Sequence, residues 1–244
     1  MTTVNALELR DVRAGYGKAT MLHDLDLALP AGAIGALLGP NGAGKTTVMR
    51  TAAGLLRPGT GTVVLAGEDV TRTPPHQRAR LGLCMVPEGR GIFRNLSVGE
   101  NLRIQAPPWV PVDDAVARAI AVFPVLGRRS RQSAGSLSGG EQQMLAMSRA
   151  FMASWKVVLL DEVSIGLAPR VVDEIYAAVR ALADSDVALL IVEQYVSRVL
   201  GMADVVFLLD HGGSTYAGPA SGLDEDRLTA GYLGPAAAAT APSR

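Results

Sequence analysis

The sequence has little cysteine, no net charge and no long apolar run, and each shortage narrows the choice of function. Cys84 is the single cysteine among 244 residues, so no disulfide can form within the chain. Its apolar surroundings, "LGLCMVP", predict a buried thiol rather than a reactive one. Lysine and arginine total 23, as do aspartate and glutamate. Because the overall basic field typical of nucleic-acid binding is missing, we expect no nucleic-acid partner.

Long hydrophobic segments are also missing. No run approaches the roughly 20 apolar residues of a membrane-spanning helix. The first residues, "MTTVNALELRDVRAGYG", carry charge early and lack the apolar run of a signal peptide. We therefore expect a cytoplasmic chain that does not itself cross a membrane. With 48% hydrophobic residues, it has enough apolar side chains for one core, or for one core with a smaller lobe.

Short apolar runs alternate with helical patterns along most of the chain. The runs are at 33–39, 61–67, 81–87, 155–161, 187–193 and 204–210. Several are apolar throughout, which is typical of parallel strands buried on both faces. Helical patterns lie between them, at 45–56, 142–154 and 170–184. The alternation predicts an α/β fold with a mostly parallel sheet.

Three segments depart from this alternation. Residues 5–30 alternate apolar with polar side chains, which predicts antiparallel strands at one edge. From about 95 to 150 the strand signals give way to helical patterns around the proline-rich "APPWVPV", which predicts a second, helical lobe. The tail at 234–244, "GPAAAATAPSR", has too few bulky apolar residues to pack, and we expect it to be disordered.

A phosphate-binding pattern follows the first of the apolar runs. "GPNGAGKT", residues 39–46, matches G-x-x-x-x-G-K-[ST] between a predicted strand and a predicted helix. Its glycines let the backbone wrap a triphosphate, Lys45 reaches the terminal phosphates, and the Thr46 hydroxyl can ligate Mg²⁺. The chain has only three lysines. A lysine in the first turn of a helix opposes the helix dipole, so an anion is the natural reason for Lys45.

Two carboxylates end the apolar run "VVLLDE". Ligands of open α/β sheets bind at the carboxyl ends of strands, so Asp161 and Glu162 should face the phosphate loop. Asp161 is the expected ligand in the Mg²⁺ shell. Glu162 is the expected base that orients the attacking water.

The stretch "LSGGEQQMLA", residues 137–146, places two glycines in the first turn of a predicted helix. Ser138 and Glu141 have the spacing of a capping box. That leaves Gly139 and Gly140 unexplained, since each glycine in a helix costs about 1 kcal/mol relative to alanine. Bare backbone at a helix N-terminus suits an anion such as phosphate. These residues alone leave a plain cap and an anion site as equal alternatives.

Together, "GPNGAGKTT", "LSGGEQQ" and "VVLLDE" followed by "SIGLAP" resemble the nucleotide-binding subunit of an ATP-binding cassette (ABC) transporter, over residues from about 5 to 233. The resemblance implies a P-loop ATPase core from 1–94 and 151–233 with an antiparallel β subdomain. It also implies that 95–150 form an inserted helical subdomain carrying the signature motif. The cofactors would be ATP and Mg²⁺.

The resemblance also assigns nucleotide contacts. In this family two subunits pair head to tail, and the signature of one closes over the phosphate loop of the other. Ser138, Gly139, Gly140 and Glu141 would thus bind the γ-phosphate of a partner's ATP. Tyr16 resembles the aromatic that stacks on adenine, with core packing as the alternative. The subunit's own ATP would be held by Gly39, Pro40, Asn41, Gly42, Ala43, Gly44, Lys45, Thr46 and Thr47.

Two positions depart from the family pattern. Glu88, in "MVPEGRGIF", stands where most members have a glutamine, and Gln194, in "LIVEQYV", where many have a histidine. A glutamate adds negative charge near Mg²⁺, so we place Glu88 with Thr46 and Asp161 in the metal shell. A glutamine can donate to phosphate but is neither acid nor base near neutral pH. We therefore expect catalysis to rest on Glu162, assisted by Lys45, Glu88 and Gln194.

The combination "VPEGRGIF", "GEQQMLA", "GLAP", "VEQ" and "GYLG" most resembles the ATPase subunits of branched-chain amino acid importers, with urea and amide importers as close relatives. This implies a second, head-to-tail ATPase subunit, two membrane permease subunits and, indirectly, an external solute-binding protein. The chain would lie on the cytoplasmic face of the cell membrane. Trp109 would then contact the membrane partner or, equally, anchor its own loop.

Two alternatives belong to other classes. Soluble ABC-type ATPases of DNA repair or translation have long coiled coils, zinc-binding cysteines or two cassettes in one chain, and this sequence has none of these. A regulatory module that binds ATP without turnover would explain Glu88 and Gln194. The intact Lys45, Asp161 and Glu162 argue against that module.

Overall fold

A six-stranded sheet forms the centre of the structure, a computed structural model that describes residues 5–193 and 196–223. Its order is β10-β9-β3-β8-β7-β6, and neighbouring strands run parallel except for the antiparallel pair β9 and β10. Every residue of β3, β7 and β8 is buried, as their apolar sequences predict. The strands are β3 (Ile34–Leu38), β6 (Leu83–Val86), β7 (Val157–Asp161), β8 (Ala188–Val192), β9 (Val205–Asp210) and β10 (Gly213–Pro219).

A second, antiparallel sheet has the order β2-β1-β4-β5. It comprises β1 (Asn5–Tyr16), β2 (Ala19–Pro30), β4 (Thr60–Leu65) and β5 (Glu68–Asp69). The antiparallel pair expected within 5–30 is therefore present. The run at 61–67 corrects the sequence reading, because β4 pairs with β1 here and not with the parallel strands. An apolar run specifies burial but not the sheet that the strand joins.

Helices cover both faces of the parallel sheet. The predicted helix at 45–56 ends at Ala52, because Gly54 has a left-handed φ of 77°. The one at 142–154 begins earlier, at Gly139, and ends in a 3₁₀ turn from Ser148 to Phe151. The helices outside the lobe are α1 (Lys45–Ala52), α2 (Pro75–Arg80), α7 (Pro169–Ala183) and α8 (Val196–Leu200).

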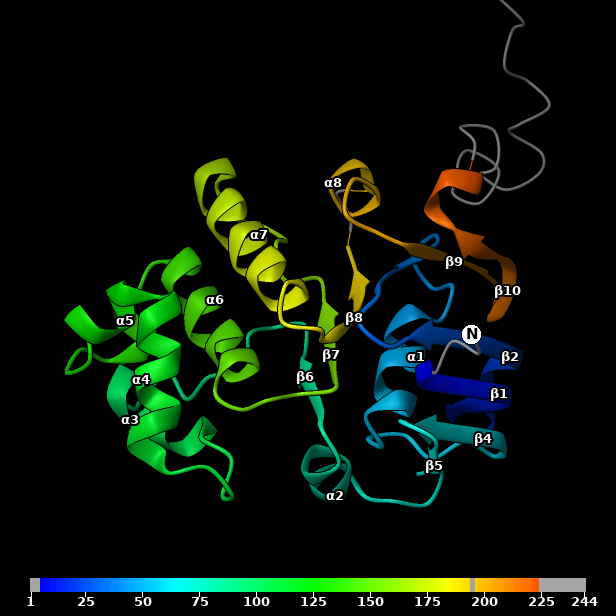
Figure 1. The fold of residues 1–244 in the computed structure, drawn as a ribbon, viewed down its shortest axis with the longest axis horizontal. Coiled ribbons are helices and arrows are strands. Elements are labelled where there is room, and N and C mark those ends of the chain that lie inside the picture. The colour runs from blue at the N-terminus through cyan, green and yellow to red at the C-terminus, as the bar shows by residue number, and fades with distance from the viewer. Residues whose placement is uncertain (1–4, 194–195, 224–244) are drawn as a thin grey trace, which may run out of the picture.

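The lobe expected from 95 to 150 consists of α3 (Val98–Gln105), α4 (Val112–Val122), α5 (Pro124–Arg128), a 3₁₀ turn (Ala134–Ser136) and α6 (Gly139–Met147). These helices lie on one side of the parallel sheet, and the antiparallel sheet lies on the other (Figure 1). None of the helices in the two described ranges is long and apolar enough to cross a membrane. The tail at 234–244 lies outside the described residues.

Alternate residues of the central strands face two separate cores. Val157 and Leu159 of β7 pack with α1 and the antiparallel sheet. Val158 and Leu160 pack instead with α6, α7 and the lobe. The α/β fold predicted from the sequence is thus confirmed. Because β3 and β7 run in the same direction, their carboxyl ends, and the residues that follow them, lie at the same edge of the sheet.

Candidate active site

The phosphate loop connects β3 to α1 through positions that only glycine fits well. Gly39 has a φ of 146°, and a Cβ there would lie 2.2 Å from the carbonyl oxygen of Leu209. Gly44 has a φ of 104°, and a Cβ there would lie 2.8 Å from the Leu22 side chain. The neighbouring Ala43 is buried and its N–H donates to the Pro40 carbonyl. The loop is thus shaped by the strands beneath it before any ligand binds.

Lys45 folds back across this loop. Its Nζ donates to the carbonyl oxygens of Gly39, at 2.7 Å, and Pro40, at 2.9 Å. Burial lowers the pKa of the Lys45 ammonium, and the negative charges of Glu162 and Asp161 oppose that shift. A partly buried cation beside glycine backbone is well placed to receive an anion.

Asp161 is a buried carboxylate in an environment that penalises its negative charge. It ends β7 with 1% of its surface exposed, and neither of its carboxylate oxygens accepts a hydrogen bond from the described residues. Burial raises its pKa to about 6, and the negative charges of Glu162 and Glu88 add to that effect. A bound cation would reverse each of these penalties.

These residues fit a Mg²⁺ ion that is shared with a nucleotide. Within the described residues, no cluster of three His, Cys, Asp or Glu side chains could hold a metal by itself. The Thr46 hydroxyl lies close enough to Asp161 to lower its pKa. Mg²⁺ keeps few protein ligands and completes its shell with phosphate oxygens and water, which suits one carboxylate and one hydroxyl.

A cleft of about 550 Å³ gathers most of the predicted nucleotide contacts. It is lined by Tyr16, Met21, Asn41, Gly42, Gly44, Lys45, Thr46, Thr47, Arg50, Glu88, Glu162 and Ile165. Gly39, Pro40 and Ala43 shape the loop without lining the cleft. Tyr16 is 44% exposed, so it is not the core residue that the alternative reading required.

Arg50 is a cleft residue that the sequence analysis did not single out. Its Nη1 donates to the Tyr16 hydroxyl at 3.2 Å, and its guanidinium lies 6.0 Å from the centre of the Tyr16 ring. A signal for it was present, because Arg50 stands four residues after Thr46 in α1 and thus on the same helical face.

A smaller cleft of about 340 Å³ lies beside the first, and both are lined by Glu88, Glu162 and Ile165. Arg90 and Gln142 also line the smaller cleft and hydrogen-bond to each other, which joins the loop after β6 to α6. Gln194 lies outside the described residues. His23, His76 and His211 are exposed. Cys84 is buried, and burial raises its thiol pKa to about 12, as expected of an unreactive cysteine.

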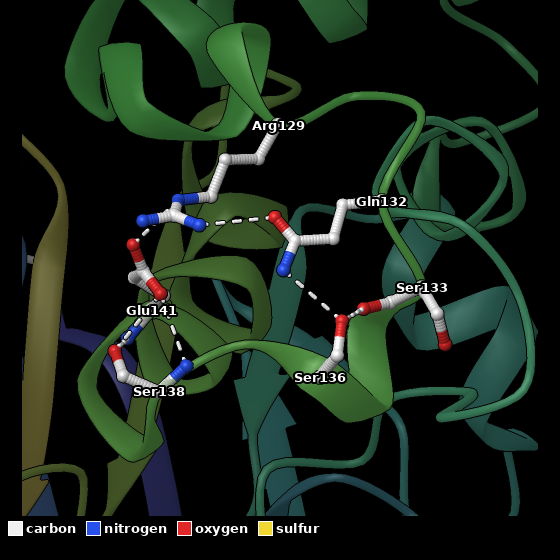
Figure 2. A network of polar contacts seen from close by, with 6 residues as sticks. All are labelled: Arg129, Gln132, Ser133, Ser136, Ser138 and Glu141. Atoms are coloured by element: carbon white, nitrogen blue, oxygen red, sulfur yellow. Dashed lines mark hydrogen bonds and ion pairs between the residues drawn. The ribbon is translucent and has the colours of Figure 1, made fainter.

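The signature residues do not line the cleft that holds the phosphate loop. The Ser138 Oγ accepts from the N–H of Glu141, and the Glu141 carboxylate accepts from the N–H of Ser138, at 3.0 Å. Figure 2 shows that Arg129 binds Glu141 and that Gln132 and Ser136 extend the network. The N-terminus of α6 is therefore braced by its own lobe.

The two glycines of α6 lie in different surroundings. Gly140 is buried, and a Cβ there would lie 2.7 Å from the Val171 side chain of α7. Gly139 is exposed, and a Cβ there would approach only the end of the Arg90 side chain, at 3.1 Å. Close packing thus accounts for Gly140 but not for Gly139.

A backbone cradle for phosphate, a cation across it and a buried acid beside the Thr46 hydroxyl serve one chemistry. The fold and the site define the class, a P-loop nucleoside triphosphatase. Comparison with known proteins narrows the class. The sequence pattern described as "ABC transporter" matches residues 22–164.

The probable branched-chain amino acid transport ATP-binding protein LivF of Archaeoglobus fulgidus is 38% identical over 89% of this chain and 94% of its own. The high-affinity branched-chain amino acid transport ATP-binding protein BraG of Pseudomonas aeruginosa is 37% identical over 84% and 89%. A solved ATP-binding subunit of an ABC transporter superposes with a TM-score of 0.80, at 22% identity over 91% of this chain and 92% of its own. The chain belongs to the ABC transporter family as an ATP-binding subunit, and it is an ATPase.

Proposed function

We propose that this chain is the ATPase subunit of an importer that takes up branched-chain amino acids or related small solutes. Two relatives named for branched-chain amino acid transport support this cargo, because their sequence similarity to this chain extends over most of each chain. Relatives named for lipopolysaccharide export, sulfate or thiosulfate import and iron import also match, at 32 to 35% identity. The ATPase never contacts the solute, so the cargo rests on likeness of sequence alone.

The placement of the signature carries the proposal of a paired subunit. The cleft is lined by residues of the phosphate loop and by Glu162, which directly follows Asp161, while Ser138, Gly139, Gly140 and Glu141 lie outside it. A second ATPase subunit, bound head to tail, brings its signature to this cleft, and this chain's signature closes the partner's. The core (1–94 and 151–233) and the helical subdomain (95–150) then act as two parts of one ATP-driven clamp.

Each predicted site residue has one role in hydrolysis. Tyr16 stacks on adenine, and the amides of 39–44 with Lys45 hold the phosphates. Mg²⁺, held by Thr46 and Asp161 with Glu88 nearby, supplies charge neutralisation to the phosphates when it is bound. Glu162 orients the water for in-line attack, and Gln194 donates to the γ-phosphate. The clamp works on the cytoplasmic face of the membrane, docked on two permease subunits and fed by an external solute-binding protein.

The first experiment is light scattering of purified Glu162→Gln with and without Mg·ATP, beside an ATPase assay of the parent chain. The variant keeps the binding site but stalls hydrolysis, so a monomer that dimerises only with Mg·ATP is the expected result. The control is Glu162→Gln combined with Gly139→Glu, which places a negative charge where the partner's phosphate binds and should stay monomeric. Dimerisation of this control with ATP would contradict the head-to-tail arrangement.

The cargo is tested separately. Co-expression with two permeases and a solute-binding protein encoded beside this chain should give ATP-dependent uptake of labelled leucine into vesicles, and Glu162→Gln should abolish that uptake. Uptake of urea or an amide instead would assign the chain to the neighbouring importers. ATPase activity stimulated by DNA or ribosomes, with no permease bound, would favour the soluble alternative.

A further inference from the structure

Glu193 is a buried carboxylate that the phosphate chemistry above does not use. It directly follows β8 and has 2% of its surface exposed. Its Oε1 accepts from the backbone N–H of Ser164 at 3.0 Å, and its Oε2 accepts from the Ser164 hydroxyl at 2.7 Å. Ser164 itself is fully buried. Both oxygens of one carboxylate thus bind a single residue that lies 29 positions earlier in the chain.

The segment held in this way contains Glu162. Asp161 is the last residue of β7 and pairs with Val192, the last residue of β8. The N–H of Glu162 then donates to the Val192 carbonyl at 2.9 Å. Glu162 has a φ of 50°, a left-handed conformation that a residue with a Cβ keeps only when its surroundings enforce it.

Val192 and Glu193 therefore hold the chain on both sides of the turn at 162–164. Val192 holds the backbone of Glu162, and Glu193 holds Ser164 two residues later. Between them, Val163 is 2% exposed and packed into the core. This packing also restrains the turn, because the backbone there cannot move without displacing the Val163 side chain. Glu162 itself lines both clefts beside the phosphate loop.

We propose that Glu193 is a positioning residue for ATP hydrolysis, because its two hydrogen bonds to Ser164 fix the turn that aims Glu162. The proposal rests on the role of Glu162 given above. Glu193 lines neither of the two clefts, so its effect on hydrolysis passes through Glu162. Displacement of a reacting group by about 1 Å can cost roughly 100-fold in rate, so loss of this brace should lower kcat and leave ATP affinity intact.

The variants separate this role from a merely structural one. Glu193→Ala removes both acceptors, and Ser164→Ala removes one donor. Glu193→Gln should restore function, because its amide oxygen accepts from the Ser164 N–H while its amide nitrogen donates to a rotated Ser164 hydroxyl. Glu174→Ala, which removes a 51% exposed glutamate of α7, is the matched control. Each variant is measured for kcat, for KM and for its affinity for a fluorescent ATP analogue.

The expected result for Glu193→Ala is a fall in kcat of about 10- to 100-fold with ATP-analogue affinity within about 3-fold of the parent. Glu193→Gln should keep at least about a third of the parent kcat, and Ser164→Ala should lie in between. In a Glu162→Gln background, Glu193→Ala should cause no further loss of the residual hydrolysis, because residues that act as a unit are not additive.

Three results would overturn the proposal. One is an unchanged kcat in Glu193→Ala, and another is a Glu193→Gln variant as impaired as Glu193→Ala. The third is a further loss of residual hydrolysis when Glu193→Ala is added to Glu162→Gln. Failure of the role proposed for Glu162 gives a different result. In that case Glu162→Gln alone would retain the parent kcat.

Discussion

Asp161 shows at the scale of one residue how the active site destabilises the nucleotide-free protein. Its pKa rises from 3.8 to about 6, through burial first and then through the charges of Glu162 and Glu88. Between pH 4 and 6 the folded chain therefore holds more protons than the unfolded chain. The free energy of unfolding falls as pH rises through this window, by at most about 3 kcal/mol, and the loss is complete above pH 6.

Asp161→Asn should for this reason stabilise the nucleotide-free protein at pH 7.5, by about 1 to 3 kcal/mol. The gain should shrink as the pH is lowered through 6 to 4 and should vanish below about pH 3, where the carboxyl of the parent is protonated in both the folded and the unfolded state. Urea denaturation at several pH values measures this, with the exposed Glu68→Gln as the control. A variant no more stable than the parent at pH 7.5 would show that Asp161 already has a partner in the free protein.

Arg78 is a second residue whose role is defined by burial. It is 1% exposed, and its Nη1 donates to the carbonyls of Thr51 and Ala52, at 2.8 and 2.7 Å, where α1 ends. Its Nη2 donates to Val70 at 2.6 Å and its Nε to Thr73 at 2.9 Å. Burial lowers its pKa to about 10, so the guanidinium stays charged at neutral pH and ties the phosphate-loop helix to the loop after β5.

Arg78→Met should destabilise the fold by about 2 to 4 kcal/mol, since several buried carbonyls lose their donor at once. Arg78→Lys should recover a part of the loss, because an ammonium offers three donors. Chemical denaturation compares these variants with Arg72→Met, which removes an exposed arginine nearby. Loss of less than about 0.5 kcal/mol in Arg78→Met would mean that water satisfies the carbonyls equally well.

At the scale of the elements, the two glycines of the signature differ in whether they pack at the contact between α6 and α7. A Cβ on Gly140 would lie 2.7 and 2.9 Å from the two methyl carbons of Val171. Gly140→Ala should therefore cost about 1 to 3 kcal/mol by overpacking, and an added Val171→Ala should restore most of it. Gly139→Ala meets only a flexible side chain and should change stability by less than about 1 kcal/mol.

Thermal denaturation measures both variants, and ATP-dependent dimerisation in the Glu162→Gln background adds the functional reading. Gly139→Ala should impair the dimer without lowering stability, because in the proposed head-to-tail dimer its Cβ would stand on the exposed surface that faces the partner's nucleotide. Equal stability of Gly139→Ala and Gly140→Ala would contradict the packing account of Gly140.

Features built from one short stretch of sequence could be predicted, whereas contacts between distant residues could not. The loop at 39–46 could be predicted because its glycines, its lysine and its flanking strand and helix lie within one short stretch. The contacts of Arg78 with Thr51, of Gly140 with Val171 and of Glu193 with Ser164 could not, since each joins residues more than 25 positions apart. The place of β4 in the antiparallel sheet was missed for the same reason. An apolar run predicts a buried strand but does not specify which strand it pairs with.

Across the whole molecule, nucleotide binding should couple to global stability through Lys45. The loop and α1 contribute Ala43, Val48 and Met49 to one core, and Leu160, next to Asp161, belongs to the core on the other face of the sheet. A ligand that binds only the native cleft therefore stabilises the entire fold. Mg·ATP at 100 times its Kd adds about 2.7 kcal/mol. For a chain of this size that corresponds to a rise in Tm of about 5 to 10 °C.

Lys45→Ala should abolish most of this rise, while Lys156→Ala, at an exposed lysine, should keep it. Calorimetry with and without Mg·ATP gives both values for each variant. Without nucleotide, Lys45→Ala should lose little stability. Lys45 itself lines an open cleft, so water can take the place of its ammonium as the donor to the carbonyls of Gly39 and Pro40. A Lys45→Ala protein with the full Mg·ATP shift would mean that the nucleotide binds elsewhere, which would remove the common basis of every catalytic role assigned above.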